Sequence, residues 1–105
     1  MTHPFKILVV NKYVHNEGEY IGRGSPLGNP YPITATASRE TVINQYREYL
    51  NREIQSGNRV IIDELTRLFE IAKVRELKLK CFCSPKPCHG DVIKDVLMKA
   101  YEGLL

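Results

Sequence analysis

Two strand-like segments that lie far apart in the chain place the strongest constraint on the fold. Residues 5–10 form a short, largely apolar and β-branched run, which is typical of a strand buried on both faces of a parallel sheet. Residues 77–83 alternate leucine and cysteine with lysine and phenylalanine, which is the period-2 pattern of a second strand. Helical patterns lie between them, and strands joined by helical crossovers run parallel. We therefore expect an α/β fold, a small Rossmann-like layer with a short parallel sheet flanked by helices.

Capping residues and apolar spacing predict three helices. The first helix runs from its N-cap Ser38 to about Gln55, and Gly57-Asn58 ends it. A second apolar stripe covers residues 61–74, and we expect the two helices to form a hairpin. The last helix opens near Gly90-Asp91, after two prolines that end the second strand.

The sheet needs a further strand, because a two-stranded sheet is marginal on its own. A long Gly/Pro-rich loop, residues 11–37, follows the first strand. Within it, residues 13–14 and 20–21 are candidates for a third strand. The alternative source is a neighbouring subunit, in which case the protein is a homodimer.

Length and charge limit the classes of function. At roughly 150 residues per domain, the 105 residues form a single domain, residues 1–105. The net charge of +3 is spread along the chain, whereas dedicated nucleic-acid binders concentrate positive charge on one face. No apolar run approaches the ~20 residues that cross a bilayer, and residues 1–4 lack the basic start of a signal peptide. We expect a cytoplasmic protein whose main partner is neither a membrane nor nucleic acid.

The three cysteines form the first candidate site. Cys81, Cys83 and Cys88 lie within eight positions, a poor layout for a disulfide framework, so we expect free thiols. Cys88 and His89 fall at the start of the last helix, where backbone N–H groups and the dipole stabilise an anion. We therefore expect Cys88 to be a nucleophilic thiol of low pKa, with His89 as its acid or base. Cys83 and Asp91 are candidate ligand contacts at the same turn, and Cys81 is expected in the core.

Two other interpretations of this cluster stay open. Three cysteines and His89 within nine residues resemble a zinc ligand set, but adjacent Cys88 and His89 cannot easily both reach one ion held by Cys81 and Cys83. We therefore assign no residue to a metal. Alternatively, the cysteines are buried thiols and the histidine hydrogen-bonds locally.

A glycine-rich segment, residues 22–30, is the second candidate site. It lacks the Gly-Lys-Ser/Thr ending of a Walker A loop, and its glycines are wrongly spaced for a dinucleotide-binding fingerprint. The glycines allow backbone N–H groups to approach a ligand, and an arginine binds a phosphate or carboxylate through two hydrogen bonds. The candidate ligand-binding residues are Gly22, Arg23, Gly24, Ser25, Gly28 and Asn29. The alternative is an Ω-type loop whose glycines only form turns.

Tyrosines near this segment are candidates for stacking on a nucleobase. Tyr20 and Tyr31 flank the glycines, and a tyrosine ring offers a flat apolar surface. Tyr46, by contrast, falls at helical spacing in an apolar stripe, so we expect it in the core.

Three ordered segments, residues 20–30, 38–50 and 81–91, together resemble the family catalogued as domain of unknown function 4326, which is found in phage and bacterial genomes. In that family the position of Phe82 is often tryptophan, so the aromatic character is kept. The Cys-His ending is also similar to one that closes a strand–turn–helix unit in the family of unknown function 488. That similarity implies a Rossmann-like layer with the Cys-His turn at the ligand end. Neither resemblance implies an activity.

Together these features predict one anion-binding pocket between the Gly-Arg-Gly loop and the Cys-His helix start. We expect its ligand to be a nucleotide or a nucleotide-derived phosphate compound, which the protein binds and, if it is an enzyme, also processes. Arg23 and the backbone near Gly24 and Gly28 would hold phosphate or ribose, and Asn29 would contact a polar edge. The alternatives are a small zinc-stabilised interaction module and a basic nucleic-acid-binding accessory protein. The sequence identifies no cofactor.

Overall fold

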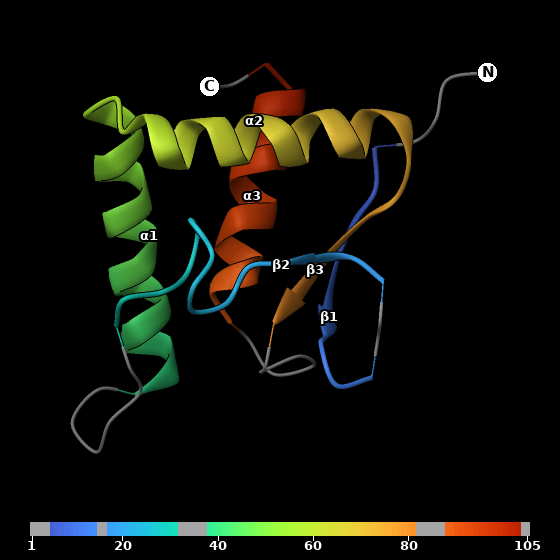
Figure 1. Cartoon of the computed structure of the whole chain (residues 1–105). Coiled ribbons are helices and arrows are strands. Elements are labelled where there is room, and N and C mark those ends of the chain that lie inside the picture. Colours follow the sequence, from blue (N-terminus) through green and yellow to red (C-terminus); the bar gives the residue numbers. More distant parts are fainter. Residues whose placement is uncertain (1–4, 15–16, 32–37, 82–87, 104–105) are drawn as a thin grey trace.

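The computed structural model describes residues 5–14, 17–31, 38–81 and 88–103. Its short strands and longer helices pack as two layers, with α1 and α3 on one side of the sheet and α2 crossing above them (Figure 1). In chain order the elements are β1 (Ile7–Asn11), β2 (Glu19–Tyr20), α1 (Arg39–Gln55), α2 (Arg59–Val74), β3 (Leu77–Cys81) and α3 (His89–Tyr101).

The sheet confirms the predicted α/β fold with parallel strands. Its order is β1-β3-β2, and both outer strands run parallel to β3. β1 pairs with β3 along its whole length, whereas β2 pairs through Glu19 and Tyr20 with Leu79 and Lys80. The third strand thus comes from this chain, at Glu19–Tyr20, which overlaps the second of the two predicted places, residues 20–21, by one residue.

β3 has the alternation that the sequence predicted. Leu77, Leu79 and Cys81 are buried, while Lys78 and Lys80 between them are half-buried. The buried side chains point toward the helical layer, because successive residues of a strand point to opposite faces.

β1 differs in part from its expectation of burial on both faces. Ile7 and Val10 are buried, but Leu8 and Val9 are only half-buried. The physical reason is that β1 is an edge strand of the described sheet, with a neighbour on one side only. Val9 packs against the core near Gly90 of α3, and Leu8 points to the opposite face of the sheet.

The helix boundaries follow the predicted caps. Ser38 caps α1 by accepting a hydrogen bond from the Thr41 N–H at 3.3 Å. Asn58, expected only as part of the stop after α1, is also the N-cap of α2, where its side-chain oxygen accepts from the Val60 and Ile61 N–H groups. One short segment therefore ends one helix and starts the next.

The expected helical hairpin is wrong. Figure 1 shows α2 crossing the end of α1 instead of lying alongside it, and α1 packs on α3. The reason is that the apolar stripe of α2 contributes to the core beside β3. Its buried members are Ile61, Leu65, Leu68 and Ala72.

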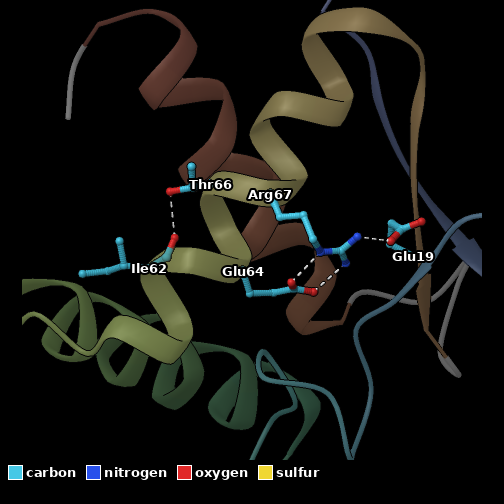
Figure 2. A network of polar contacts seen from close by, with 5 residues as sticks. All are labelled: Glu19, Ile62, Glu64, Thr66 and Arg67. Carbon is cyan, nitrogen blue, oxygen red and sulfur yellow. Dashed lines mark hydrogen bonds and ion pairs between the residues drawn. The ribbon is translucent and has the colours of Figure 1, made fainter.

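An arginine of α2 links this helix to the short strand β2 (Figure 2). Arg67 donates two hydrogen bonds of 2.7 Å to Glu64, one turn earlier on α2, and another to Glu19 of β2. The hydrogen bonds that Arg67 donates to Glu64 and Glu19 raise the pKa of Arg67 above its usual value, so the guanidinium stays charged. Partly exposed ion pairs contribute less than about 1 kcal/mol each, so this contact positions β2 more than it stabilises the fold.

The core extends from the sheet and helices into the glycine-rich loop. Ile21 and Leu27 of that loop are each only 1% exposed and join the cluster formed by the strands and helices. The loop is therefore packed against the core. Among the described helices none is long and apolar enough to span a bilayer.

The central position of Leu79 on β3 gives a first prediction. Its side chain is 0% exposed, and truncating a buried leucine leaves a cavity that its neighbours fill only in part. We expect Leu79→Ala to lower the free energy of unfolding by about 2–5 kcal/mol, measured by urea unfolding followed by circular dichroism. Val74→Ala, at an exposed position that ends α2, is the control and should change it by less than about 0.5 kcal/mol. Equal effects of the two substitutions would contradict the central placement of β3.

Candidate functional site

The candidate site lies where the loop after β2 meets the start of α3. Both segments are at the carboxyl ends of the parallel strands, which is the edge at which open α/β sheets bind ligands. The Ile21 N–H donates to the Lys80 carbonyl at 3.1 Å, so the chain stays beside β3 as it leaves β2. Cys88, the N-cap of α3, lies against the last residue of β3, Cys81.

Two consecutive β-turns give the loop its shape. The Ser25 N–H donates to the Gly22 carbonyl and the Gly28 N–H to the Ser25 carbonyl, each at 3.0 Å. Gly24, the third residue of the first turn, has a φ of +94°, a conformation that residues with a side chain rarely adopt. The Ser25 hydroxyl also donates to the Gly22 carbonyl, at 2.7 Å. The serine and glycines predicted as ligand contacts thus form the turns of the loop.

A buried tyrosine of α1 holds the loop in place. Tyr46 is 0% exposed, and its hydroxyl donates a hydrogen bond of 2.7 Å to the Leu27 carbonyl. Burial raises the pKa of Tyr46 above its usual value, so the hydroxyl keeps the proton that it donates. The Tyr46 ring also contacts the His89 ring edge-on, with 5.1 Å between the ring centroids. Its predicted core position is confirmed, and its hydrogen bond adds a second role.

Cys88 and Asp91 cap the start of α3. The Cys88 N–H donates to the Asp91 carboxylate at 3.1 Å, and the Cys88 sulfur accepts from the Gly90 N–H at 3.3 Å. The carboxylate predicted as a ligand contact is therefore part of the helix cap. Gly90 allows α3 to begin close to the sheet, because a Cβ there would lie 2.9 Å from the side chain of Ile21 and 3.0 Å from that of Val9.

The expected low pKa of Cys88 is wrong. The Cys88 thiol is 3% exposed and donates to the Cys81 sulfur across 3.2 Å. This hydrogen bond, together with burial, raises the pKa of Cys88 above its usual value and outweighs the opposite effect of the Gly90 N–H. The nucleophilic role of Cys88 stays a prediction, and the core position of Cys81 is confirmed. Cys83 lies outside the described residues.

His89 connects the start of α3 to the loop. Its Nε2 atom lies 2.6 Å from the Ile21 carbonyl oxygen. Because a carbonyl only accepts, Nε2 carries the proton, and in the neutral ring Nδ1 is the acceptor nitrogen. Burial lowers the pKa of His89 below its usual value, so the neutral ring is favoured. The acid or base role of His89 stays a prediction, and the structure adds a positioning role.

An open cavity of about 260 Å³ lies on the loop. All the predicted loop residues except Gly22 line it, together with Pro30. Arg23 is exposed, and within the described part of the chain no ion pair or hydrogen bond engages its side chain. Cys88 and His89 are not among the lining residues. The loop and the helix start therefore touch through Ile21, but the cavity belongs to the loop.

The other predicted contacts have partners within the fold. The Asn29 side-chain oxygen accepts from the Tyr31 N–H at 2.8 Å, which fixes the end of the loop. The Tyr31 ring contacts the Tyr49 ring with 6.0 Å between centroids, and the Lys12 ammonium lies 4.8 Å from the centroid of the Tyr20 ring. Neither Tyr20 nor Tyr31 lines the cavity.

The zinc interpretation depends on a residue that the structure leaves out. Across residues 5–14, 17–31, 38–81 and 88–103, no three His, Cys, Asp or Glu side chains are grouped to hold a metal ion. A complete ligand set would have to include Cys83, which is outside these ranges.

Comparison with known proteins places the chain in a family. The model of the domain of unknown function DUF4326 matches residues 10–99, which include the loop and the start of α3. The chain belongs to the DUF4326 family. An uncharacterized 12.4 kDa protein from the nrdA-td intergenic region of Enterobacteria phage T4 is 35% identical over 94 residues, covering 90% of this chain and 80% of the phage protein. No solved structure gives a significant match.

Two positioning contacts of the DUF4326 site were missed at the level of sequence, Tyr46 to Leu27 and His89 to Ile21. In both contacts the acceptor is a backbone carbonyl. Every residue has one, so the sequence does not show which carbonyl accepts. A signal existed for the first contact. A tyrosine in a buried helical stripe needs a partner for its hydroxyl, which a leucine or phenylalanine does not.

The Tyr46 hydroxyl can be tested by removing it alone. In the DUF4326 protein, Tyr46→Phe keeps the ring but leaves the buried Leu27 carbonyl without its donor. We expect the free energy of unfolding to fall by about 1–3 kcal/mol, measured by urea unfolding. Tyr101→Phe, which removes a hydroxyl from a residue that is 55% exposed, is the matched control. A Tyr46→Phe protein as stable as this control would contradict the anchoring contact.

The lowered pKa of His89 predicts how stability depends on pH. Between the folded pKa and the unfolded value of about 6.5, the unfolded chain binds more protons than the folded one. The free energy of unfolding should therefore fall as the pH drops from about 6.5 through the folded pKa, and this contribution should level off below it. His89→Gln keeps an N–H donor for Ile21 but does not titrate.

Urea unfolding of both proteins between about pH 5 and 7.5 isolates this contribution, because His3 and His15 remain in each. We expect the stability of the wild type, relative to His89→Gln, to decrease toward low pH. A relative stability that increases toward low pH would mean that the folded protein favours the charged ring.

Proposed function

We propose that this DUF4326 protein binds a phosphate-bearing small molecule, a nucleotide or a nucleotide-derived metabolite, at the loop cavity. The observation that carries the proposal is the Arg23 side chain, which lines the cavity, is exposed and has no partner among the described residues. A guanidinium binds phosphate through two parallel hydrogen bonds, whereas a lysine ammonium acts as a point charge. The arginine therefore suits phosphate better.

The order within the loop supports a binding role. Turn hydrogen bonds, the Tyr46 contact and the His89 contact hold the backbone on both sides of Arg23. A ligand that binds to an ordered loop loses less affinity to the entropy cost of fixing it. A solvated linker of the same composition would lack this advantage.

The size of the cavity limits which part of the ligand it holds. Its volume of about 260 Å³ is slightly smaller than that of most small-molecule sites, which usually measure ~300–1,000 Å³. We therefore assign it to the phosphate or ribose-phosphate part of the ligand, with the base on the adjoining surface. The start of α3 is not a second phosphate site, since Cys88 and Asp91 already cap it.

Binding takes precedence over turnover in this proposal. A nucleophilic Cys88 requires a thiolate, which burial and the hydrogen bond with Cys81 disfavour. His89, in turn, uses Nε2 to hold Ile21. Catalytic roles for Cys88 and His89 stay predictions, and loss of turnover in Cys88→Ser would be their test.

Calorimetric titration with a set of defined probes tests the proposal. The probes are inorganic phosphate and the monophosphates AMP, GMP, CMP and UMP. We expect at least one monophosphate to bind, and Arg23→Ala to weaken that binding about 10- to 100-fold because a charge-assisted hydrogen-bond pair is lost.

Arg52→Ala is the matched control, since Arg52 is an exposed arginine near the end of α1 and does not line the cavity. It should bind the monophosphate as the wild type does. The proposal fails if no probe binds the wild type, or if Arg23→Ala and Arg52→Ala bind equally well.

A further inference from the structure

Cys81 and Cys88 are two cysteines that are not joined by a disulfide and whose sulfurs are in direct contact. Their sulfur atoms lie 3.2 Å apart, and the side chains are 1% and 3% exposed. Cys81 is the last residue of β3, and Cys88 is the N-cap of α3. The strand before Cys81 and the helix after Cys88 therefore fix the backbone next to each cysteine and hold the two sulfurs together.

We propose that Cys81 and Cys88 form an intramolecular disulfide when the protein meets a small disulfide such as oxidised glutathione. The sulfur atoms of a disulfide lie about 2.05 Å apart, so these two need to approach by roughly 1 Å. A side-chain rotation or a small shift of the first turn of α3 covers that distance. The inference does not depend on the proposed ligand.

The reaction is a thiol–disulfide exchange in two steps. One cysteine loses its proton, and its thiolate attacks a sulfur of oxidised glutathione. The S–S bond of glutathione breaks, one glutathione thiolate leaves, and a mixed disulfide remains on the protein. The second cysteine, as its thiolate, attacks the protein sulfur of that mixed disulfide and releases the other glutathione. Both cysteine sulfurs are oxidised, and the two protons end on the two reduced glutathione molecules.

Both redox states are compatible with the start of α3. Oxidation removes the S–H donor of Cys88, but its sulfur keeps the lone pairs that accept from the Gly90 N–H. Any shift of Cys88 toward Cys81 also moves the adjacent His89, whose Nε2 holds the Ile21 carbonyl at 2.6 Å. The disulfide would therefore act on the glycine-rich loop through an existing contact.

Burial sets the rate of this oxidation. Neither sulfur is exposed to a molecule as large as glutathione while the first turn of α3 is closed. The exchange therefore proceeds through local opening of that turn. If the turn opens only rarely, the thiols that it covers react slowly. We expect oxidation to be slower than that of the same thiols in urea-unfolded protein.

The Cys83→Ser variant allows a direct test, because it leaves Cys81 and Cys88 as the two thiols of the chain. The folded variant is incubated with excess oxidised glutathione, quenched with acid and weighed by intact mass spectrometry. We expect a monomer lighter by two hydrogen atoms and without bound glutathione, which dithiothreitol converts back. Its thermal unfolding midpoint should be higher than that of the reduced form, because the cross-link restricts the unfolded chain.

Two matched controls carry one thiol each, Cys81→Ser and Cys88→Ser, both in the Cys83→Ser background. They should accumulate a mixed disulfide with glutathione, since no second thiol can displace it. Cys83→Ala serves as a second background if Cys83→Ser does not fold by circular dichroism.

Three outcomes of this experiment would overturn the proposal. In the first, the two-thiol protein keeps glutathione attached. In the second, it forms a disulfide between two chains. In the third, it stays reduced while the single-thiol controls react. Stoichiometric zinc in the purified wild type, released when the thiols are blocked, would also overturn it by making these sulfurs metal ligands.

Discussion

The pairing of β3 with a strand on each of its sides determines where the rest of the structure lies. β1 and β2 both bond to β3, and β2 contributes only two residues. The loop leaves β2 beside the end of β3, and α3 starts with a cysteine in contact with the last residue of β3. A chain with so short a sheet thus brings its loop and its last helix to one edge because both are attached to the same central strand.

The loop takes its shape from contacts that end on its own backbone. The carbonyls of Ile21, Gly22 and Leu27 accept from His89, Ser25 and Tyr46, which come from α3, the loop itself and α1. Two helices that are distant in sequence therefore hold one glycine-rich segment. Among the described residues, no hydrogen bond or ion pair engages the Arg23 side chain, which lies on the surface of this loop.

Local signals in the sequence predicted the helices and strands. The features that the sequence did not predict depend on tertiary contacts. Capping residues and period-2 or helical spacing are properties of a few neighbouring residues, so Ser38, the end of α2 near Val74 and the alternation of β3 were predicted correctly. An apolar stripe shows that a helix is buried but not against what, which is why the expected hairpin is wrong. The helix start at Cys88 predicted a low pKa, but the hydrogen bond with Cys81 and burial raise the pKa of Cys88 instead.

The way in which α3 is capped decides where an anion can bind. A helix start attracts an anion while its N–H groups lack partners, but here the sulfur of Cys88 takes the Gly90 N–H, and the carboxylate of Asp91 bonds back to the Cys88 N–H. In the proposed function, positive charge for the ligand comes from the loop, where Arg23 lines the cavity. The strand–turn–helix unit contributes by holding that loop through His89, so weakening the His89 contact should disturb the cavity without removing any group that lines it.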